Sequence, residues 1–196
     1  MLVLTSLFSC LSDQNGGSSS DPEMDRFISD LMDRMTLDEK IGQINLVSVG
    51  FDVTGPRVSE DVEDKIVNGK VGAVFNTYTP VAVRKLQELA VTKSRLGIPL
   101  LFGCDVVHGH RTIFPVPLGL AASWDMDLIE KSARIAAEEA SAEGLCWTFS
   151  PMVDIARDPR WGRICEGSGE DAWYGSRVAE AMVKGYQGED LFAPNT

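Results

Sequence analysis

Residues 99–117, P-L-L-F-G-C-D-V-V-H-G-H-R-T-I-F-P-V-P, join a continuous apolar run to a polar segment that contains glycine. An apolar run without polar alternation is typical of a strand covered on both faces, as in a parallel sheet. The first polar side chain after this run is that of Asp105. The stretch therefore predicts a buried strand whose carboxyl end opens into a polar loop.

The same order of strand and helix recurs along the chain. Apolar segments predict strands at residues 44–49, 71–75, 99–104 and 145–149. Helical spacing predicts helices at residues 22–35, 36–41, 59–69, 79–97, 123–144 and 172–186. Strands that alternate with helices in this way indicate an α/β fold with a parallel sheet.

Two long polar segments, residues 103–117 and 151–171, each follow a predicted strand. In a (β/α)8 barrel these segments would be loops at the carboxyl-terminal face, where ligands bind. Four of the eight strand and helix units can be recognised. The fold class predicted is therefore a TIM-barrel-like α/β domain, of which the chain holds roughly the first half.

Several helix starts carry capping signals. Asp21 before Pro22 and Thr79 before Pro80 are typical N-termini. The tetrapeptide T-L-D-E at residues 36–39 is a capping box. Ser59 and Ser123 are expected to cap the helices that follow them.

Length and composition limit the class of protein. A chain of 196 residues with 44% hydrophobic content can bury an ordinary domain core. Its net charge of -11 argues against a nucleic-acid partner, because phosphate binding needs a basic face. The four cysteines show no C-x-x-C spacing, so neither a zinc knuckle nor a disulfide framework is predicted. Cys104 and Cys146 lie in apolar runs and are expected to be buried.

Residues 1–21 are expected to stand apart from a barrel domain at 22–196. The L-F-S-C sequence that ends at Cys10 resembles a bacterial lipobox, in which the cysteine is lipidated, and a polar linker follows it. The alternative is a ragged or truncated N-terminus. No run approaches the roughly 20 apolar residues that span a bilayer. We therefore expect an exported protein, periplasmic or lipid-anchored at Cys10, without a transmembrane segment.

Residues 150–171, S-P-M-V-D-I-A-R-D-P-R-W-G-R-I-C-E-G-S-G-E-D, combine acids with arginines and contain no lysine. The planar guanidinium of arginine suits fixed, multidentate contacts to carboxylates or ligand oxygens. Two interpretations stay open. The charges form a structural ion-pair network, or some of them face a pocket.

Individual side chains suggest roles. Asp105 can accept hydrogen bonds from two ligand hydroxyls, or it pairs with Arg111 or Arg163. His108 and His110, the two histidines of the chain, form an H-x-H that holds a metal in some barrel hydrolases. A third ligand is not evident, so a structural role is favoured and no metal is expected. Trp161 either stacks on a sugar ring or anchors its loop.

The motifs resemble a known family. G-C-D-V-V-H-G-H-R-T-I-F-P-V-P-L-G-L-A-A-S-W-D, the F-S-P-M-V-D-I-A-R-D-P-R-W-G-R-I-C-E-G-S-G-E-D segment and an earlier M-T-L-D-E-K-I-G-Q are similar to the N-terminal domain of glycoside hydrolase family 3. The resemblance runs in order from about Met24 to the C-terminus. It is specific, because three long motifs occur in the family's order.

The resemblance implies a β-glucosidase that removes terminal, non-reducing β-D-glucosyl residues from β-glucosides or oligosaccharides with retention, without a cofactor. Within the family's motifs, Asp105 and Arg163 match residues that bind hydroxyls of the terminal sugar. Supporting roles are assigned to the remaining motif residues His108, Arg111, Trp161, Glu166 and Asp171.

One departure from the family pattern concerns catalysis itself. Retaining hydrolysis needs two carboxyl groups about 5–5.5 Å apart. In the family the nucleophile and the acid/base lie downstream of the position of residue 196, so the chain alone is predicted to be inactive. The alternatives are a short sugar-binding lipoprotein and a metal-dependent barrel hydrolase using His108 and His110. The sequence does not choose between glucosidase and xylosidase.

Overall fold

The computed structural model describes residues 21–49 and 61–188 of the chain. The chain divides into two compact units, Met1–Met35 and Thr36–Thr196. In the first unit, helix α1 (Pro22–Arg34) begins as predicted, with Asp21 accepting a hydrogen bond from the Glu23 amide. Cys10 and the Ser59 cap lie outside the described residues.

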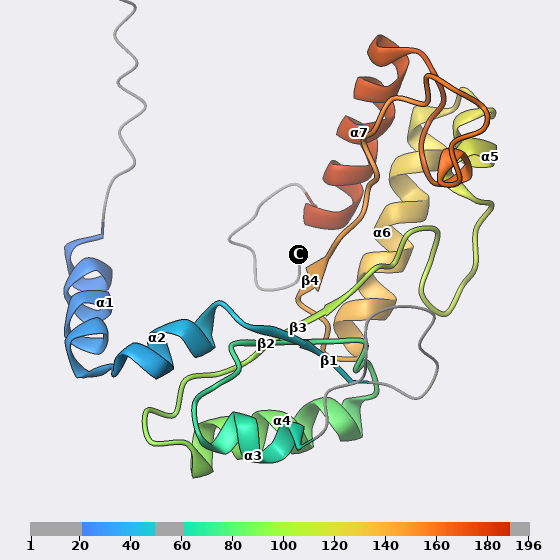
Figure 1. The fold of residues 1–196 in the computed structure, drawn as a ribbon. Coiled ribbons are helices and arrows are strands. Elements are labelled where there is room, and N and C mark those ends of the chain that lie inside the picture. Colours follow the sequence, from blue (N-terminus) through green and yellow to red (C-terminus); the bar gives the residue numbers. More distant parts are fainter. Residues whose placement is uncertain (1–20, 50–60, 189–196) are drawn as a thin grey trace, which may run out of the picture. The chain divides into compact units, whose positions relative to one another are not determined.

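The second unit contains a four-stranded parallel sheet (Figure 1). Its strands are β1 (Leu46–Ser48), β2 (Ala73–Phe75), β3 (Leu101–Cys104) and β4 (Trp147–Thr148). Each strand pairs in parallel with the next one in the sequence, in the order β1-β2-β3-β4. This sequential order is that of a (β/α)8 barrel wall. The predicted parallel sheet is confirmed, although the strands are shorter than the apolar runs.

Helices precede, connect and follow the strands of this unit. They are α2 (Leu37–Gln43), α3 (Val62–Val67), α4 (Pro80–Lys93), α5 (Pro117–Ala121), α6 (Met126–Ala142) and α7 (Ala172–Gln187), with a short 3-10 helix η1 (Ile164–Glu166). Figure 1 shows α3 beside α4, and α6 beside α7. The capping box at Thr36 and Glu39 is present, and the Thr79 side chain caps α4. These local predictions are confirmed.

The predicted cap at Ser123 is wrong. Asp125 caps α6, because its carboxylate accepts a hydrogen bond of 2.9 Å from the Leu128 amide. Ser123 instead closes the short helix α5, which was not predicted. Its hydroxyl donates to the Leu120 carbonyl oxygen at 2.7 Å and accepts from the Asp125 amide at 3.2 Å.

Two apolar clusters form the core of this unit. One lies between the sheet and its helices and contains the fully buried Val74 and Phe102. The other lies along α6 and α7 and contains Ile129 and Val178. Tyr186 packs against both clusters. The two clusters therefore meet at the C-terminal end of α7.

The expected burial of the two strand cysteines is only partly observed. Cys104 is half-buried, but Cys146 is exposed, which contradicts the prediction. Cys146 directly precedes β4, and β4 lies at the edge of the sheet formed by the described residues. An apolar run at a sheet edge lacks the second neighbouring strand that would cover it.

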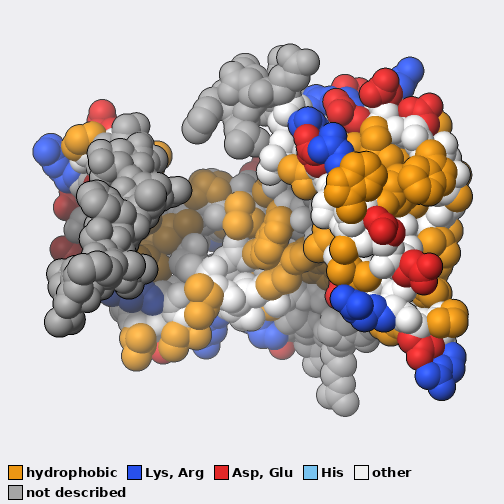
Figure 2. Space-filling model, turned by 90° about the horizontal axis from the view of Figure 1, so that it is seen from above, with side chains coloured by type: hydrophobic (Ala, Val, Ile, Leu, Met, Phe, Trp, Pro, Cys, Tyr) orange, Lys and Arg blue, Asp and Glu red, His pale blue; other side chains and the backbone are white. Residues whose placement is uncertain are grey.

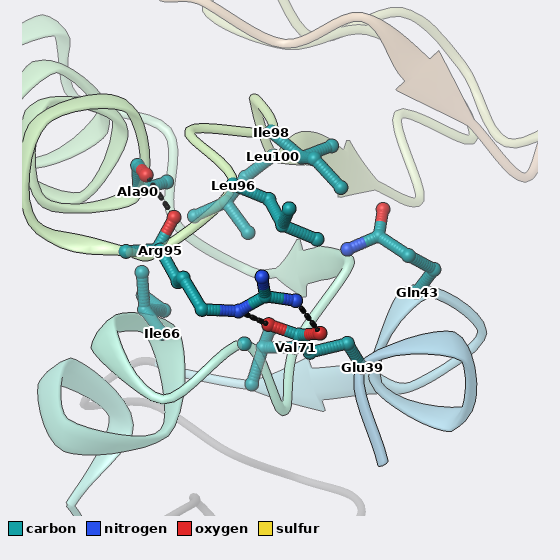
Figure 3. Close-up of a pocket in the computed structure, with 11 residues that line it drawn as sticks. Glu39, Gln43, Ile66, Val71, Ala90, Arg95, Leu96, Ile98 and Leu100 are labelled. Atoms are coloured by element: carbon teal, nitrogen blue, oxygen red, sulfur yellow. Dashed lines mark hydrogen bonds and ion pairs between the residues drawn. The ribbon is translucent and has the colours of Figure 1, made fainter. Parts of the chain in front are cut away.

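The amino-terminal ends of the strands carry a structural ion pair (Figure 3). Arg95 Nε donates to Glu39 Oε1 at 2.9 Å, and Arg95 Nη2 donates to Oε2 at 2.5 Å. Hydrogen bonds from Arg95 and Thr36 lower the pKa of Glu39 to about 2. The space that these side chains border, with Ile66 and Leu100, has a volume of only about 20 Å³. At this end of a barrel such residues serve stability rather than ligand binding.

Candidate functional site

A hollow of about 280 Å³ lies at the carboxyl-terminal ends of β3 and β4. It is lined by residues from the two segments that follow these strands: Asp105, Val107, Phe149, Ser150, Met152, Asp154, Arg163 and Glu166. Figure 2 looks down on the end of the molecule that holds α5 and α7, where acidic, basic and hydrophobic side chains lie next to one another. The polar segments singled out in the sequence therefore converge on one hollow.

Asp105 directly follows β3, and its side chain is exposed to the hollow. The next residue, Val106, is buried and has a φ of 29°. A β-branched residue with positive φ is strained by about 1–3 kcal/mol and persists only where its surroundings hold it. The backbone beside Asp105 is therefore held in place by tertiary contacts.

Arg163 enters the hollow from the turn before η1 and is held by Glu166. Its Nε donates to Glu166 Oε1 at 2.9 Å, and its Nη2 donates to Oε2 at 2.6 Å. These hydrogen bonds raise the pKa of Arg163 and lower the pKa of Glu166. The negative charges of Asp154 and Asp105 add to the rise at Arg163. The Arg163 side chain remains 60% exposed, so it can donate further hydrogen bonds to a ligand.

Aromatic rings form the apolar side of the site. The Phe149 ring, which borders the hollow, contacts Phe75 edge-on at 5.4 Å and Trp147 at 4.6 Å between centroids. An aromatic surface beside charged groups suits a ligand with both an apolar face and hydroxyls.

The loop that begins at Asp105 is anchored at its far end to α6. Arg111 Nε donates to Glu143 Oε1 at 2.6 Å, and His110 Nε2 donates to Glu143 Oε2 at 2.8 Å. Burial acts to raise the pKa of Glu143, but the bonds from His110 and Arg111 outweigh it and hold that pKa below its usual value. Glu139 adds bonds from the amides of Arg111 and Thr112.

The two histidines of the H-x-H motif have different hydrogen-bond partners. His108 Nδ1 donates to the Phe114 carbonyl oxygen at 2.9 Å, whereas His110 is bound to Glu143. Each imidazole thus has its own protein partner. Within residues 21–49 and 61–188, no three His, Cys, Asp or Glu side chains are placed to hold a metal ion. The metal-dependent alternative is not favoured.

The remaining predicted residues lie outside the lining of the hollow. Arg111 pairs with Glu143, and Asp171 caps α7 by accepting a hydrogen bond of 2.6 Å from the Tyr174 amide. Trp161 is half-buried in the loop, and its amide donates to the Asp158 carbonyl oxygen. Among the predicted residues the hollow therefore contains Asp105, Arg163 and Glu166.

The sequence did not assign roles to several lining residues. Asp154 was visible as one acid among five in its loop, but nothing in its local sequence separated it from Asp158, which pairs with Arg160 instead. Phe149 could have been found, because it is the last aromatic residue of a predicted strand. Its position at the carboxyl end of β4 is the signal.

Comparison with known proteins agrees with this geometry. Residues 36–194 match the family described as Glycosyl hydrolase family 3 N terminal domain. A periplasmic beta-glucosidase of Salmonella typhimurium is 50% identical over 165 residues, which are 84% of this chain and 21% of that protein. A beta-glucosidase of Listeria innocua, solved with isofagomine, superposes with a TM-score of 0.75 at 41% identity over 84% of this chain and 23% of that one. An exo-1,3/1,4-beta-glucanase of Pseudoalteromonas superposes with a TM-score of 0.72 at 30% identity, over 88% of this chain and 23% of that one.

The parallel strand and helix order, with a polar hollow at the carboxyl ends of the strands, defines an α/β protein of the TIM-barrel class. The chain belongs to glycoside hydrolase family 3, within the N-terminal domain. It spans between a fifth and a quarter of the length of these three relatives. Among the described residues, no helix is long and apolar enough to cross a membrane.

Proposed function

We propose that the hollow binds the terminal sugar in a retaining, exo-acting glycoside hydrolase of the β-glucosidase type. The observation that carries this proposal is that Asp105 and Arg163, 58 positions apart in the sequence, line the same hollow at the carboxyl end of the sheet. A volume of about 280 Å³ is at the lower end of the range for small-molecule sites, which suits one sugar ring.

The two side chains offer complementary hydrogen bonds. The Asp105 carboxylate can accept from two neighbouring hydroxyls at once. The Arg163 guanidinium donates, and Glu166 holds its fork in one orientation while leaving it exposed. The Phe149 ring supplies an apolar surface for the C–H face of the sugar.

Glu166, which lines the same hollow, is poorly suited to act as a general acid. A general acid must be protonated at the working pH, which calls for a raised carboxyl pKa. The pKa of Glu166 is instead lowered by Arg163. We therefore propose that this segment binds sugar, and that the nucleophile and the acid/base of the β-glucosidase come from elsewhere in the enzyme. The 196-residue polypeptide alone should give no turnover of an aryl β-glucoside above the rate without protein.

Glucose binding to the 196-residue polypeptide tests the proposal. Titration followed by NMR should show saturable shifts for amides near Asp105 and Arg163. Asp105→Asn and Arg163→Lys should each weaken binding at least about tenfold, because a charge-assisted hydrogen bond is lost or misplaced. Arg160→Lys is the matched control, since Arg160 forms the same kind of pair with Asp158 outside the hollow. Equal weakening by Arg160→Lys and Arg163→Lys would contradict the assignment.

We further propose that the protein is exported by a bacterium, with residues 22–196 forming the barrel segment. The relative named periplasmic supports this. The finer proposal, a lipid anchor at Cys10, rests on the lipobox-like sequence alone. Mass spectrometry of the protein from its native membrane fraction should show a lipid-modified cysteine, and an unmodified Cys10 thiol in an otherwise intact N-terminus would contradict the anchor.

A further inference from the structure

Tyr186, near the C-terminal end of α7, touches both segments that line the hollow. Its hydroxyl donates a hydrogen bond of 2.7 Å to the carbonyl oxygen of Val106. The Ser150 hydroxyl lies 3.0 Å from the Tyr186 hydroxyl oxygen, and it can donate to that oxygen because the Tyr186 proton is already directed at Val106. Val106 and Ser150 are 80 and 36 positions from Tyr186 in the sequence, so only the folded chain brings the three together.

The position of Tyr186 is fixed by the packing of α7 on α6. At the preceding residue, Gly185, a Cβ atom would lie 2.3 Å from the Glu130 carbonyl oxygen and 2.7 Å from the Ala133 Cβ. The two helices are therefore in backbone contact at this point. The Tyr186 ring also packs against both apolar clusters of the core. Its hydroxyl is consequently presented from a rigid support.

The two partners of this hydroxyl belong to the two segments that line the hollow. Val106 directly follows Asp105 and has the positive φ described above. Ser150 begins the segment that continues through Asp154 to Arg163, and Ser150 itself borders the hollow. We propose that Tyr186 is a positioning residue that ties the Asp105 segment to the Ser150–Arg163 segment and so sets the relative position of the sugar-binding side chains.

Two further observations support this role. Tyr186 does not line the hollow, so it acts through the two segments rather than by touching a ligand. A tyrosine hydroxyl is protonated at neutral pH, and burial raises the pKa of Tyr186 further, with the Ser150 bond opposing this, so the hydroxyl is able to donate. The consequence for sugar binding rests on the proposed function, whereas the link between the two segments does not.

The experiment compares Tyr186→Phe with Tyr174→Phe in the 196-residue chain. Tyr174 is the matched control, because it lies on the same helix and its buried hydroxyl donates to the Ala121 carbonyl oxygen, away from both segments. Each variant removes one hydroxyl and keeps the ring. Amide hydrogen exchange of residues 105–109 and 149–154 is measured first, and glucose affinity second.

Tyr186→Phe should speed exchange in both segments about five- to tenfold, the factor that corresponds to the loss of one hydrogen bond. Tyr174→Phe should leave exchange there unchanged. In a Ser150→Ala background the effect of Tyr186→Phe on residues 149–154 should disappear, because that bond is already absent. Glucose affinity should fall severalfold in Tyr186→Phe only.

Equal exchange in the two tyrosine variants would overturn the positioning role. An altered exchange pattern with unchanged glucose affinity would overturn its link to binding. If the unaltered chain binds no glucose, the proposed function fails instead, and hydrogen exchange still decides whether Tyr186 joins the two segments.

Discussion

Two glycines in α7 should respond to alanine with opposite signs. Gly185 touches α6 so closely that an added Cβ would lie 2.3 Å from the Glu130 carbonyl oxygen. At Gly175, in the same helix, an added Cβ would meet nothing within 4 Å. Both substitutions gain the same intrinsic helix propensity, about 1 kcal/mol relative to glycine. The difference between them therefore isolates the cost of forcing α7 away from α6.

The magnitudes decide the outcome. Overpacking a tight interior costs about 1–3 kcal/mol, and the upper part of this range applies here because the obstacle is backbone that cannot rotate away. Gly185→Ala should therefore destabilise by about 1–2 kcal/mol after the helix gain is subtracted. For a chain of this size that corresponds to a Tm lower by roughly 2–8 °C. Gly175→Ala should raise the Tm by up to about 4 °C.

Thermal unfolding followed by far-UV circular dichroism measures both changes. Urea titration gives the free energies, and an unchanged m value would show that the unfolded state is not altered. A Gly185→Ala protein that melts at or above the temperature of the unaltered chain would refute the close approach of α6 and α7. Gly185→Ala should also disturb Tyr186, so exchange of residues 105–109 should rise in this variant and not in Gly175→Ala.

Three further changes test other parts of the fold. Because the folded pKa of Glu39 is depressed to about 2, its contribution to stability is present above pH 4.5 and is lost as the pH falls toward 2. Glu39→Gln should therefore make the urea midpoint less dependent on pH over this window. An unchanged pH dependence of the midpoint would contradict the pairing of Glu39 with Arg95. Glu143→Gln should lower the free energy of unfolding, measured by urea titration, by about 1–3 kcal/mol, because it weakens the bonds to His110 and Arg111. Glu138→Gln is the control: Glu138 forms an exposed ion pair, so its loss should cost under about 0.5 kcal/mol. Phe102→Ala should cost about 3–5 kcal/mol, and a loss below about 1 kcal/mol would place Phe102 outside the core.

The sequence by itself predicted the elements whose causes are local. Thr36 and Glu39 are three positions apart, so their capping box could be identified before the fold was known. Apolar runs of strand length between helical patterns predicted the parallel sheet, because each strand must be covered on both faces. Asp105 was predicted to lie at the end of a strand, because it is the first polar residue after the apolar run at residues 99–104. Ser123 shows the limit of local patterns, since a serine and an aspartate two positions apart both satisfied the rule for a cap.

Only the tertiary structure decided which of the polar groups share a site. Arg163 could have paired with Asp105 or remained free, and the fold gives it Glu166 while keeping it in the hollow with Asp105. Tyr186 carried no sequence signal, because its partners are 36 and 80 positions away. Contacts over such separations depend on how helices pack against the sheet and against one another. For Tyr186 the deciding contact is the close approach of α7 to α6 at Gly185. Packing of this kind leaves no periodic pattern in the sequence.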